Sequence, residues 1–176
     1  NKNAQKTYHR NHPNTRLNSD DRDIDYKSMK SHLGKIDIVI GGPPCQGYST
    51  VGTRDVNDPR NHLYKEYCRI VETIMPEFFV IENVKGLTTL SGGAFKDDII
   101  ERFSELGYKV QYKILNAADY GIPQNRYRVF FVGTRNRNFE FPTPLNYKVT
   151  TKEAIGDLPK IVGAEKITEY RNEAIT

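Results

Sequence analysis

Cysteine, long apolar runs and targeting segments are scarce in this sequence. Its 176 residues include two cysteines, Cys45 and Cys68, with no CxxC motif and no Cys/His spacing typical of a zinc site. We therefore expect neither a disulfide framework nor a bound metal. No apolar run approaches the roughly 20 residues of a membrane span, and no charged-then-apolar amino-terminal segment resembles a signal peptide. These absences predict a cytosolic protein with reduced thiols and no membrane partner.

Charge gives little guidance about the partner. The formal net charge is +4, and residues 1–35 account for it with eight Lys and Arg against four Asp. A second basic cluster, formed by Arg126, Arg128, Arg135 and Arg137, lies near the end of the last apolar run. Such clusters suit a polyanion, but they are equally typical of a solvated face. Charge alone leaves both interpretations open.

Alternating strand and helix patterns predict an α/β fold. Apolar and β-branched runs predict strands at about 36–41, 78–82, 109–115 and 128–133, the first of them fully buried. Helical spacing predicts helices at about 1–11, 63–74 and 94–106. No helix separates the last two strands, so we expect them to pair antiparallel at one edge of an otherwise parallel sheet.

A cysteine follows the first predicted strand in an unusual setting. Cys45 comes after Pro43 and Pro44 and is followed by Gly47. Open α/β sheets bind ligands at the carboxyl ends of their strands, which is where this thiol would stand. A lone loop cysteine is ordinarily a small apolar residue, and Cys68, beside the apolar stripe of the 63–74 helix, fits that description. The stiff Pro-Pro approach favours a presented thiol at Cys45.

A carboxylate ends the second predicted strand. Glu82 follows four apolar residues, and burying it without a partner would be costly. It could pair with an arginine, or it could donate a proton in catalysis. Arg126 and Arg128, at i and i+2 on a strand, face the same side. Their guanidinium groups could balance Glu82, or they could hold a carbonyl oxygen or a phosphate.

Three short motifs, in this order, resemble those of the cytosine-5 DNA methyltransferases. They are Pro44-Cys45-Gln46 after one strand, Glu82-Asn83-Val84 after the next, and Gln124-Asn125-Arg126-Tyr127-Arg128 before a third. The resemblance covers roughly residues 2–159. It implies a Rossmann-like sheet of the S-adenosylmethionine-dependent methyltransferases, mostly parallel with one antiparallel edge strand and truncated at both ends in this chain.

The resemblance also implies a reaction. Methyl would pass from S-adenosylmethionine to carbon 5 of a flipped cytosine in double-stranded DNA, through a covalent bond between Cys45 and carbon 6. Glu82 would protonate ring nitrogen 3, Arg128 would hold the base carbonyl oxygen, and Arg126 would support the thiol. Gln46 and Ser49 either fill space or grip the phosphate of the extruded nucleotide.

Cofactor contacts follow from the same resemblance. They fall on Asp23, Ile24, Pro44 and Leu63. Asp23 would accept a hydrogen bond from the adenine amino group, although Arg22 stands where the family has glycine and the segment by itself is typical of a charged surface loop. Leu63 is equally well explained as a core leucine. The family's glycine-rich cofactor loop and its ribose-binding acid do not occur in this sequence.

These expectations divide the chain and place it in a system. We assign residues 1–145 to a partial catalytic domain without the cofactor loop, and residues 146–176 to a linker and the start of a target-recognition region. We expect the piece to be inactive alone. Its parent would be a prokaryotic, nucleoid-associated monomer of a restriction-modification system with a cognate endonuclease.

Three rival interpretations remain. The first is a tRNA cytosine-5 methyltransferase of the same family, although Gly47-Tyr48-Ser49 is more similar to the bacterial DNA enzymes. The second is a catalytically silent homologue that binds nucleic acid. The third is an unrelated Rossmann-like domain, which has to treat the three ordered motifs as coincidence.

Overall fold

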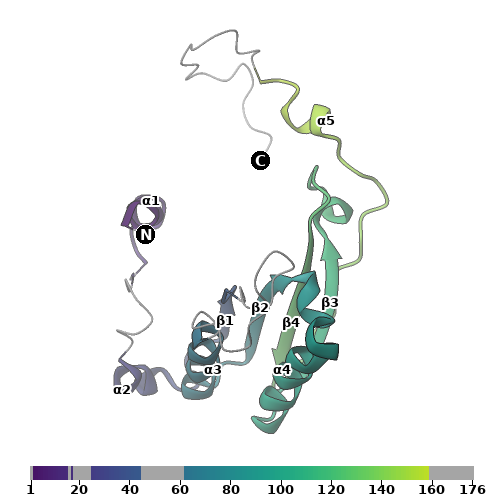
Figure 1. The fold of residues 1–176 in the computed structure, drawn as a ribbon. Helices are drawn as coiled ribbons and strands as arrows, with labels where there is room; N and C mark the ends of the chain where they lie inside the picture. Colours follow the sequence, from purple (N-terminus) through teal and green to yellow (C-terminus); the bar gives the residue numbers. More distant parts are fainter. Residues whose placement is uncertain (1, 16, 18–24, 45–61, 159–176) are drawn as a thin grey trace.

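The computed structural model describes residues 2–15, 17, 25–44 and 62–158 (Figure 1). The helices are α1 (Lys2–Asn11), α2 (Tyr26–Met29), α3 (His62–Ile74), α4 (Ala94–Glu105) and α5 (Thr151–Ile155), and the strands are β1 (Ile38–Gly41), β2 (Phe78–Val84), β3 (Lys109–Asn116) and β4 (Tyr127–Thr134). The four predicted strands and three predicted helices are confirmed to within two residues at each end. In the part of the chain that the structure describes, no helix is long and apolar enough to cross a membrane.

The four strands form one mixed sheet in the order β1-β2-β4-β3. β1 and β2 are parallel, and β4 runs antiparallel to both β2 and β3. The expected antiparallel pairing of the last two strands is therefore confirmed. The pair lies at one edge of the described sheet, as expected, but the reversed strand, β4, is its inner member and β3 forms the edge. A short connection after β3 turns the chain back, and β4 then returns between β2 and β3.

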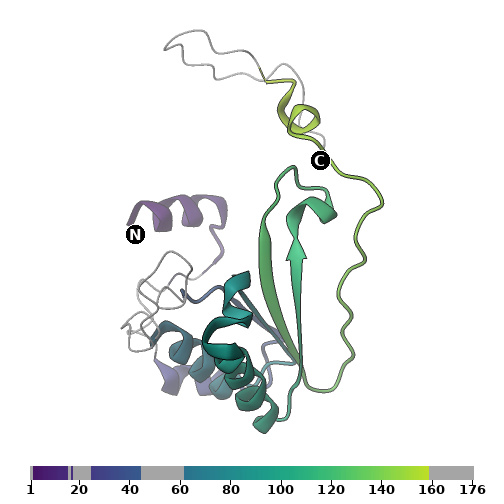
Figure 2. The same cartoon turned by 45° about the vertical axis from the view of Figure 1, so that its right-hand side comes forward.

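One face of the sheet carries the core. The helices α3 and α4 lie against this face, as Figures 1 and 2 show. Phe79 from β2, Phe103 from α4 and Tyr108 form an aromatic cluster at the centre, with the Phe79 and Phe103 ring centroids 4.1 Å apart. A Cβ atom on Gly133 would lie 1.9 Å from Cε1 of Phe79. The close fit of Phe79 over β4 therefore depends on glycine at that position.

The other face is covered less completely. Ile38 and Ile40 in β1 are 46% and 70% exposed, although the sequence predicts a fully buried strand. Alternate side chains of a strand point to opposite faces, and α3 covers the face to which Val39 belongs. A continuous apolar run therefore does not reveal whether one face or both are covered. Tyr112 and Ile114 in β3 are each 43% exposed for a different reason: they share the core face with their partners Phe131 and Val129, but they lie on the edge strand.

After β4 the chain runs back beside β3 as an extended segment (Figure 2). The side chain of Gln111 donates to the carbonyl of Phe139 at 3.1 Å, and the Tyr120 hydroxyl donates to that of Pro142 at 3.2 Å. The following helix, α5, begins at a capping box between Thr150 and Glu153. The bonds from Gln111 and Tyr120 hold residues 139–142 to β3 and to the turn that follows it.

Candidate active site

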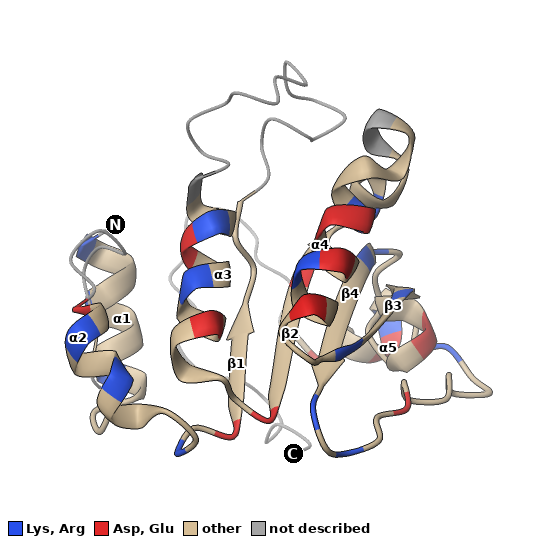
Figure 3. Ribbon diagram, turned by 90° about the horizontal axis from the view of Figure 1, so that it is seen from below, with Lys and Arg blue, Asp and Glu red and all other residues tan. Residues whose placement is uncertain are grey.

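The candidate site lies at the edge of the sheet where β1 and β2 end. α3 begins on the same side of the molecule as the end of β1 (Figure 3). Among the residues expected at the site, the structure describes Pro44, Leu63, Glu82, Arg126 and Arg128. The remaining ones, Asp23, Ile24, Cys45, Gln46 and Ser49, lie outside the described residues.

Glu82 and Arg128 form an ion pair across two strands. Nε of Arg128 lies 3.0 Å from Oε1 of Glu82, and the two side chains are 24% and 37% exposed. The strand register causes this meeting, because Val84 pairs with Arg128 and places the arginine diagonally across from Glu82 on one face. The sequence did not determine which group pairs with Glu82, and in the structure its partner is Arg128. A pair this exposed contributes about 1 kcal/mol or less to stability, so its main effect is to orient the carboxylate.

The backbone of Gly42 lies on the other side of the Glu82 carboxylate. A Cβ atom on Gly42 would lie 3.3 Å from Oε2 of Glu82. The backbone leaving β1 therefore passes close to the carboxylate, and it continues through Pro43 and Pro44 directly into Cys45. Sequence reasoning gave Gly42 no role. The sequence signal was the glycine pair Gly41-Gly42 at the end of a strand. Glycine in such a position often marks a close approach of the backbone to another group, because it has no side chain.

Asn83 ties the two strand ends together. Its side-chain amide donates to the carbonyl of Pro43 at 3.0 Å, and its Oδ1 accepts from the backbone N–H of Val84 at 2.9 Å. Asn83 is 7% exposed, so these are buried bonds. The sequence motif contains this residue, but the sequence assigned no function to it. In the structure it fixes the backbone that leads to Cys45 against the strand that carries Glu82.

The two arginines of the third motif are placed differently. Arg128 lies within β4, where its Nη1 also donates to the carbonyl of Tyr127 at 2.8 Å. Arg126 precedes the strand, and its side chain is exposed. Its backbone carbonyl accepts from the N–H of Ala117 at 3.0 Å, which closes the turn between β3 and β4. The structure thus brings Arg128 to Glu82 and leaves Arg126 at the surface of the same edge.

Two of the four residues expected to contact the cofactor, Pro44 and Leu63, are among the described residues. Pro44 is exposed and follows the buried Pro43, and Leu63 is half-buried in the first turn of α3. Their apolar surfaces face partly to solvent at the strand ends, which fits contact with a bound small molecule. The half-buried position of Leu63 is equally compatible with a core leucine.

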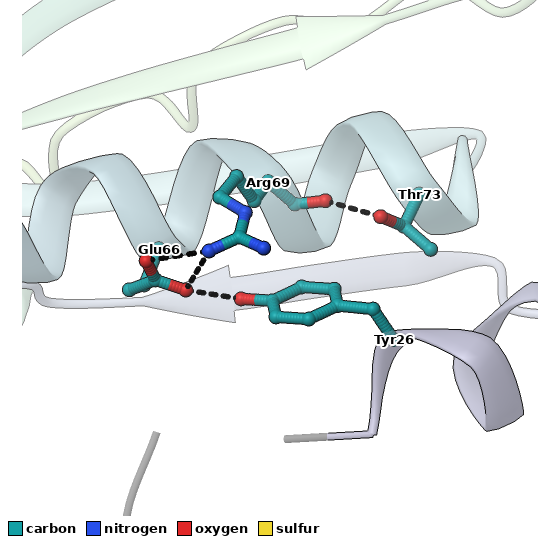
Figure 4. Close-up of polar contacts among 4 residues, drawn as sticks. All are labelled: Tyr26, Glu66, Arg69 and Thr73. Atoms are coloured by element: carbon teal, nitrogen blue, oxygen red, sulfur yellow. Dashed lines mark hydrogen bonds and ion pairs between the residues drawn. The ribbon is translucent and has the colours of Figure 1, made fainter. Parts of the chain in front are cut away.

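A polar clasp attaches α2 to α3 (Figure 4). Asp25 caps α2 by accepting two backbone N–H groups. Tyr26 donates its hydroxyl proton to Glu66, and Arg69 lies over the Tyr26 ring with its Cζ 4.2 Å from the centroid. Nη1 of Arg69 also contacts Glu66 at 2.9 Å. These contacts hold α2, which follows Asp23 and Ile24 in the chain, against α3, which carries Leu63.

The second cysteine is excluded as a nucleophile by its burial. Cys68 has no solvent exposure, and burial raises the pKa of its thiol to about 11. Because the thiolate is the reactive form, Cys68 is inert at neutral pH. This confirms the interpretation of Cys68 as a small packed residue. Across residues 2–15, 17, 25–44 and 62–158, no group of three or more His, Cys, Asp or Glu could hold a metal ion.

The fold and the site together define an α/β protein whose candidate chemistry sits at the carboxyl ends of neighbouring strands. A family model described as C-5 cytosine-specific DNA methylase matches residues 1–175. The chain belongs to this family.

Similar proteins agree with that assignment. The Type II methyltransferase M1.HphI of Haemophilus parahaemolyticus is 41% identical over 177 residues, which cover 96% of this chain and 48% of that protein. The Type II methyltransferase M.FnuDI of Fusobacterium nucleatum is 45% identical over 159 residues, covering 86% and 45%. The chain thus spans about half the length of the curated relatives it matches.

Solved structures show the same fold. A putative DNA modification methyltransferase encoded within a prophage of E. coli superposes with a TM-score of 0.65 and 31% identity, covering 82% of this chain and 42% of that one. The Dnmt2 methyltransferase of S. pombe gives a TM-score of 0.62 at 23% identity, covering 80% and 43%. The second likeness concerns the fold alone.

Proposed function

We propose that this chain forms part of a DNA (cytosine-5) methyltransferase. The observation that carries the proposal is the position of Glu82, held by Arg128 on one side and lying against the Gly42 backbone on the other. That backbone continues within three residues into Cys45, and the proposal is that its thiol acts at the same edge of the sheet as the acid. The names of the two curated relatives described above, both Type II methyltransferases, support the same activity.

The chemistry needs those two groups together. Carbon 5 of cytosine is a poor nucleophile, and addition of the Cys45 thiolate to carbon 6 makes it an enamine carbon. The Cys45 sulfur forms the new bond, the electron pair moves into the ring, and Glu82 supplies a proton to nitrogen 3. Once carbon 5 carries the methyl group, a base takes the carbon 5 proton, and that bond's electron pair re-forms the double bond between carbons 5 and 6. The sulfur leaves carbon 6 as thiolate, and the nitrogen 3 proton returns to Glu82. The target base must be flipped out of the duplex for this contact.

Members of this family use S-adenosylmethionine, which supplies the methyl group. In this chain Asp23, Ile24, Pro44 and Leu63 would hold it, and Pro44 and Leu63 have the partly exposed apolar surface that such contact requires. Arg128 would orient Glu82 and bind the base carbonyl oxygen, with Arg126 beside it.

Two further residues and the partner follow from the same proposal. Gln46 and Ser49 would grip the phosphate of the extruded nucleotide. The exposed residues of α4 include Asp97, Asp98, Glu101 and Glu105 against a single exposed arginine, Arg102, so this helix is unsuited to a polyanion (Figure 3). Double-stranded DNA would therefore approach the edge of the sheet that carries Arg126.

The domain assignment is part of the proposal. Residues 1–145 would belong to the catalytic domain, and residues 146–176 would lead toward a target-recognition region. We further propose that residues 1–176 alone do not methylate DNA, and detectable methyl transfer by this piece would refute that. The proposed setting is a monomer at the bacterial nucleoid that acts alongside a restriction endonuclease.

A trapped adduct tests the activity. The product of the complete reading frame that encodes this chain is mixed with S-adenosylmethionine and DNA containing 5-fluorocytosine, whose fluorine blocks the final elimination. A denaturation-resistant adduct that disappears with Cys45→Ala is expected. An adduct on RNA alone would move the activity to RNA. No adduct on either, from protein shown to bind the cofactor, would overturn the proposal.

A further inference from the structure

The buried hydroxyl of Tyr67 reaches the backbones of both strands that lead to the site. Tyr67 lies in the middle of α3 and is 7% exposed. Its hydroxyl oxygen is 3.1 Å from the carbonyl oxygen of Val39 in β1 and 2.9 Å from that of Val80 in β2. A hydroxyl has a single proton, so the two carbonyls share one donor. The bond thus joins β1 to β2 through a helix that packs beneath them.

The ring of Tyr67 fixes the same strand by contact. A Cβ atom on Gly41 would lie 2.6 Å from both Cδ2 and Cε2 of this ring. Glycine at the last residue of β1 therefore allows the strand to lie directly on the tyrosine. The hydroxyl bond and the ring contact together fix the position of β1 relative to α3 and β2.

β1 needs such support because its own ladder is short. It consists of the four residues Ile38–Gly41, and it pairs with β2 in the parallel arrangement, which is slightly less stable per residue than the antiparallel one. The Tyr67 hydroxyl joins the two strands at Val39 and Val80, and the amide of Asn83 joins them again at Pro43. Gly42, which lies against Glu82, sits between the two ties.

We propose that Tyr67 is a positioning residue for the reaction. Its hydroxyl sets how far β1 extends along β2, and thereby places the Gly42–Pro44 backbone, and the thiol that follows it, relative to the Glu82 carboxylate. This inference rests on the proposed function, because it assigns Tyr67 to the geometry of that same site. Tyr67 itself contacts neither the base nor the cofactor.

The test compares Tyr67→Phe with the unchanged protein. In the product of the complete reading frame, the single-turnover rate of adduct formation with 5-fluorocytosine DNA is measured at saturating S-adenosylmethionine. Because small displacements of reacting groups are costly, we expect the rate to fall about tenfold or more. The dissociation constant for S-adenosylmethionine should not change. An unchanged adduct rate in a folded Tyr67→Phe protein would overturn the inference.

Tyr64→Phe is the matched control. Tyr64 lies one turn earlier on α3 and is 5% exposed, and its hydroxyl donates to Oδ2 of Asp98 at 3.1 Å, away from the strands. Both variants lose a buried hydroxyl, so both should lower the melting temperature. The adduct rate should fall with Tyr67→Phe alone. An equal fall in both would show that the rate reports general loosening, and Tyr67 would have no special role.

A rescue variant guards against misfolding of Tyr67→Phe. Replacing Tyr67 by 4-aminophenylalanine keeps the ring and restores an N–H donor at its tip. We expect this protein to form the adduct near the original rate, whereas a folded variant with a low rate would overturn the proposed hydrogen-bonding role. If the unchanged protein itself forms no adduct, the proposed function has failed, which separates that result from failure of this inference.

Discussion

The two ends of the sheet carry the same four kinds of polar side chain and use them differently. The site end, where β1 and β2 finish, has an acid, an asparagine, an arginine and a tyrosine: Glu82, Asn83, Arg128 and Tyr67. The far end, where β2 and β3 begin, has Glu77, Asn136, Arg135 and Tyr108. Residue type alone therefore does not separate the two ends.

At the far end every one of these groups closes a loop. Asn136 occupies both oxygens of Glu77, with its backbone N–H 2.7 Å from Oε1 and its amide nitrogen 3.0 Å from Oε2. Nη1 of Arg135 donates to the carbonyl of Met75 at 3.2 Å, and Tyr108 donates to that of Pro76 at 2.7 Å. These bonds join the loops that flank β2 and β4. The polar side chains at the far end therefore have a structural role, because they hold these loops together.

The acid is held differently at the site end. Arg128 contacts one oxygen of Glu82, and the other lies beside a glycine backbone that leads to Cys45. The Glu82 carboxylate is thus oriented by an arginine on one side and has only glycine backbone on the other, which leaves space for a ligand to contact it. Glu82 is the proposed proton donor because of the groups that surround it, more than because of its position on a strand.

The largest expected difference between the ends comes from their acids. Glu82→Gln removes the proposed proton donor, so adduct formation should slow by about 10²–10⁴-fold, the usual contribution of general acid catalysis. Glu77→Gln should leave that rate unchanged. Single-turnover adduct measurements on both variants check this. Equal slowing by the two changes would contradict the distinction between the ends.

A glycine in β4 offers the next largest effect. In Gly133→Ala the new methyl group would meet the buried Phe79 ring, and overpacking of this kind costs about 1–3 kcal/mol of folding free energy. Urea unfolding measures the loss. The protein that remains folded should form the adduct at the original rate, since the change lies toward the far end. A slowed rate in fully folded protein would mean that the far end also governs the site.

Gly42→Ala is the counterpart at the site end. Gly42 is not among the described glycines with positive φ, so alanine introduces no backbone strain there. Its methyl group would press on Oε2 of Glu82, and the adduct rate should fall about tenfold through displacement of the carboxylate. Stability should change little, because the tip of a half-exposed side chain can move. A large loss of stability with an unchanged rate would reverse the assignment.

The smallest expected effect is the acid dependence of the far end. Hydrogen bonds from Asn136 lower the pKa of Glu77 below its ordinary value. A lowered pKa in the folded state contributes stability that is present above the ordinary glutamate pKa and is lost as the pH falls through the lowered one. The melting temperature of Glu77→Gln should therefore lie below that of the unchanged protein at neutral pH, and the two should converge on acidification. A gap that persists in acid would contradict this origin.

Part of this structure could be predicted from the sequence. β-branched runs located the strands, and a carboxylate directly after Ile81 marked Glu82 as unusual. The sequence could not choose between Arg126 and Arg128 as its partner, because the choice depends on the register in which Val84 pairs with Arg128. The bond from Asn83 to Pro43 joins residues 40 positions apart and has no local signature. The exposure of Ile40 depends likewise on what packs over the strand.

The central place of β4 affects how the chain is made. β3 pairs with β4 in the described sheet, and β4 joins it to β2, so the strands cannot unite before Thr134 has left the ribosome. Chains fold from the amino terminus during synthesis, and until then β2 and β3 present unpaired edges of the kind that aggregate. Arg128 arrives with the same strand. Adding β4 to the sheet therefore also places Arg128 beside Glu82. A chain still being synthesised cannot form this ion pair before β4 has joined the sheet.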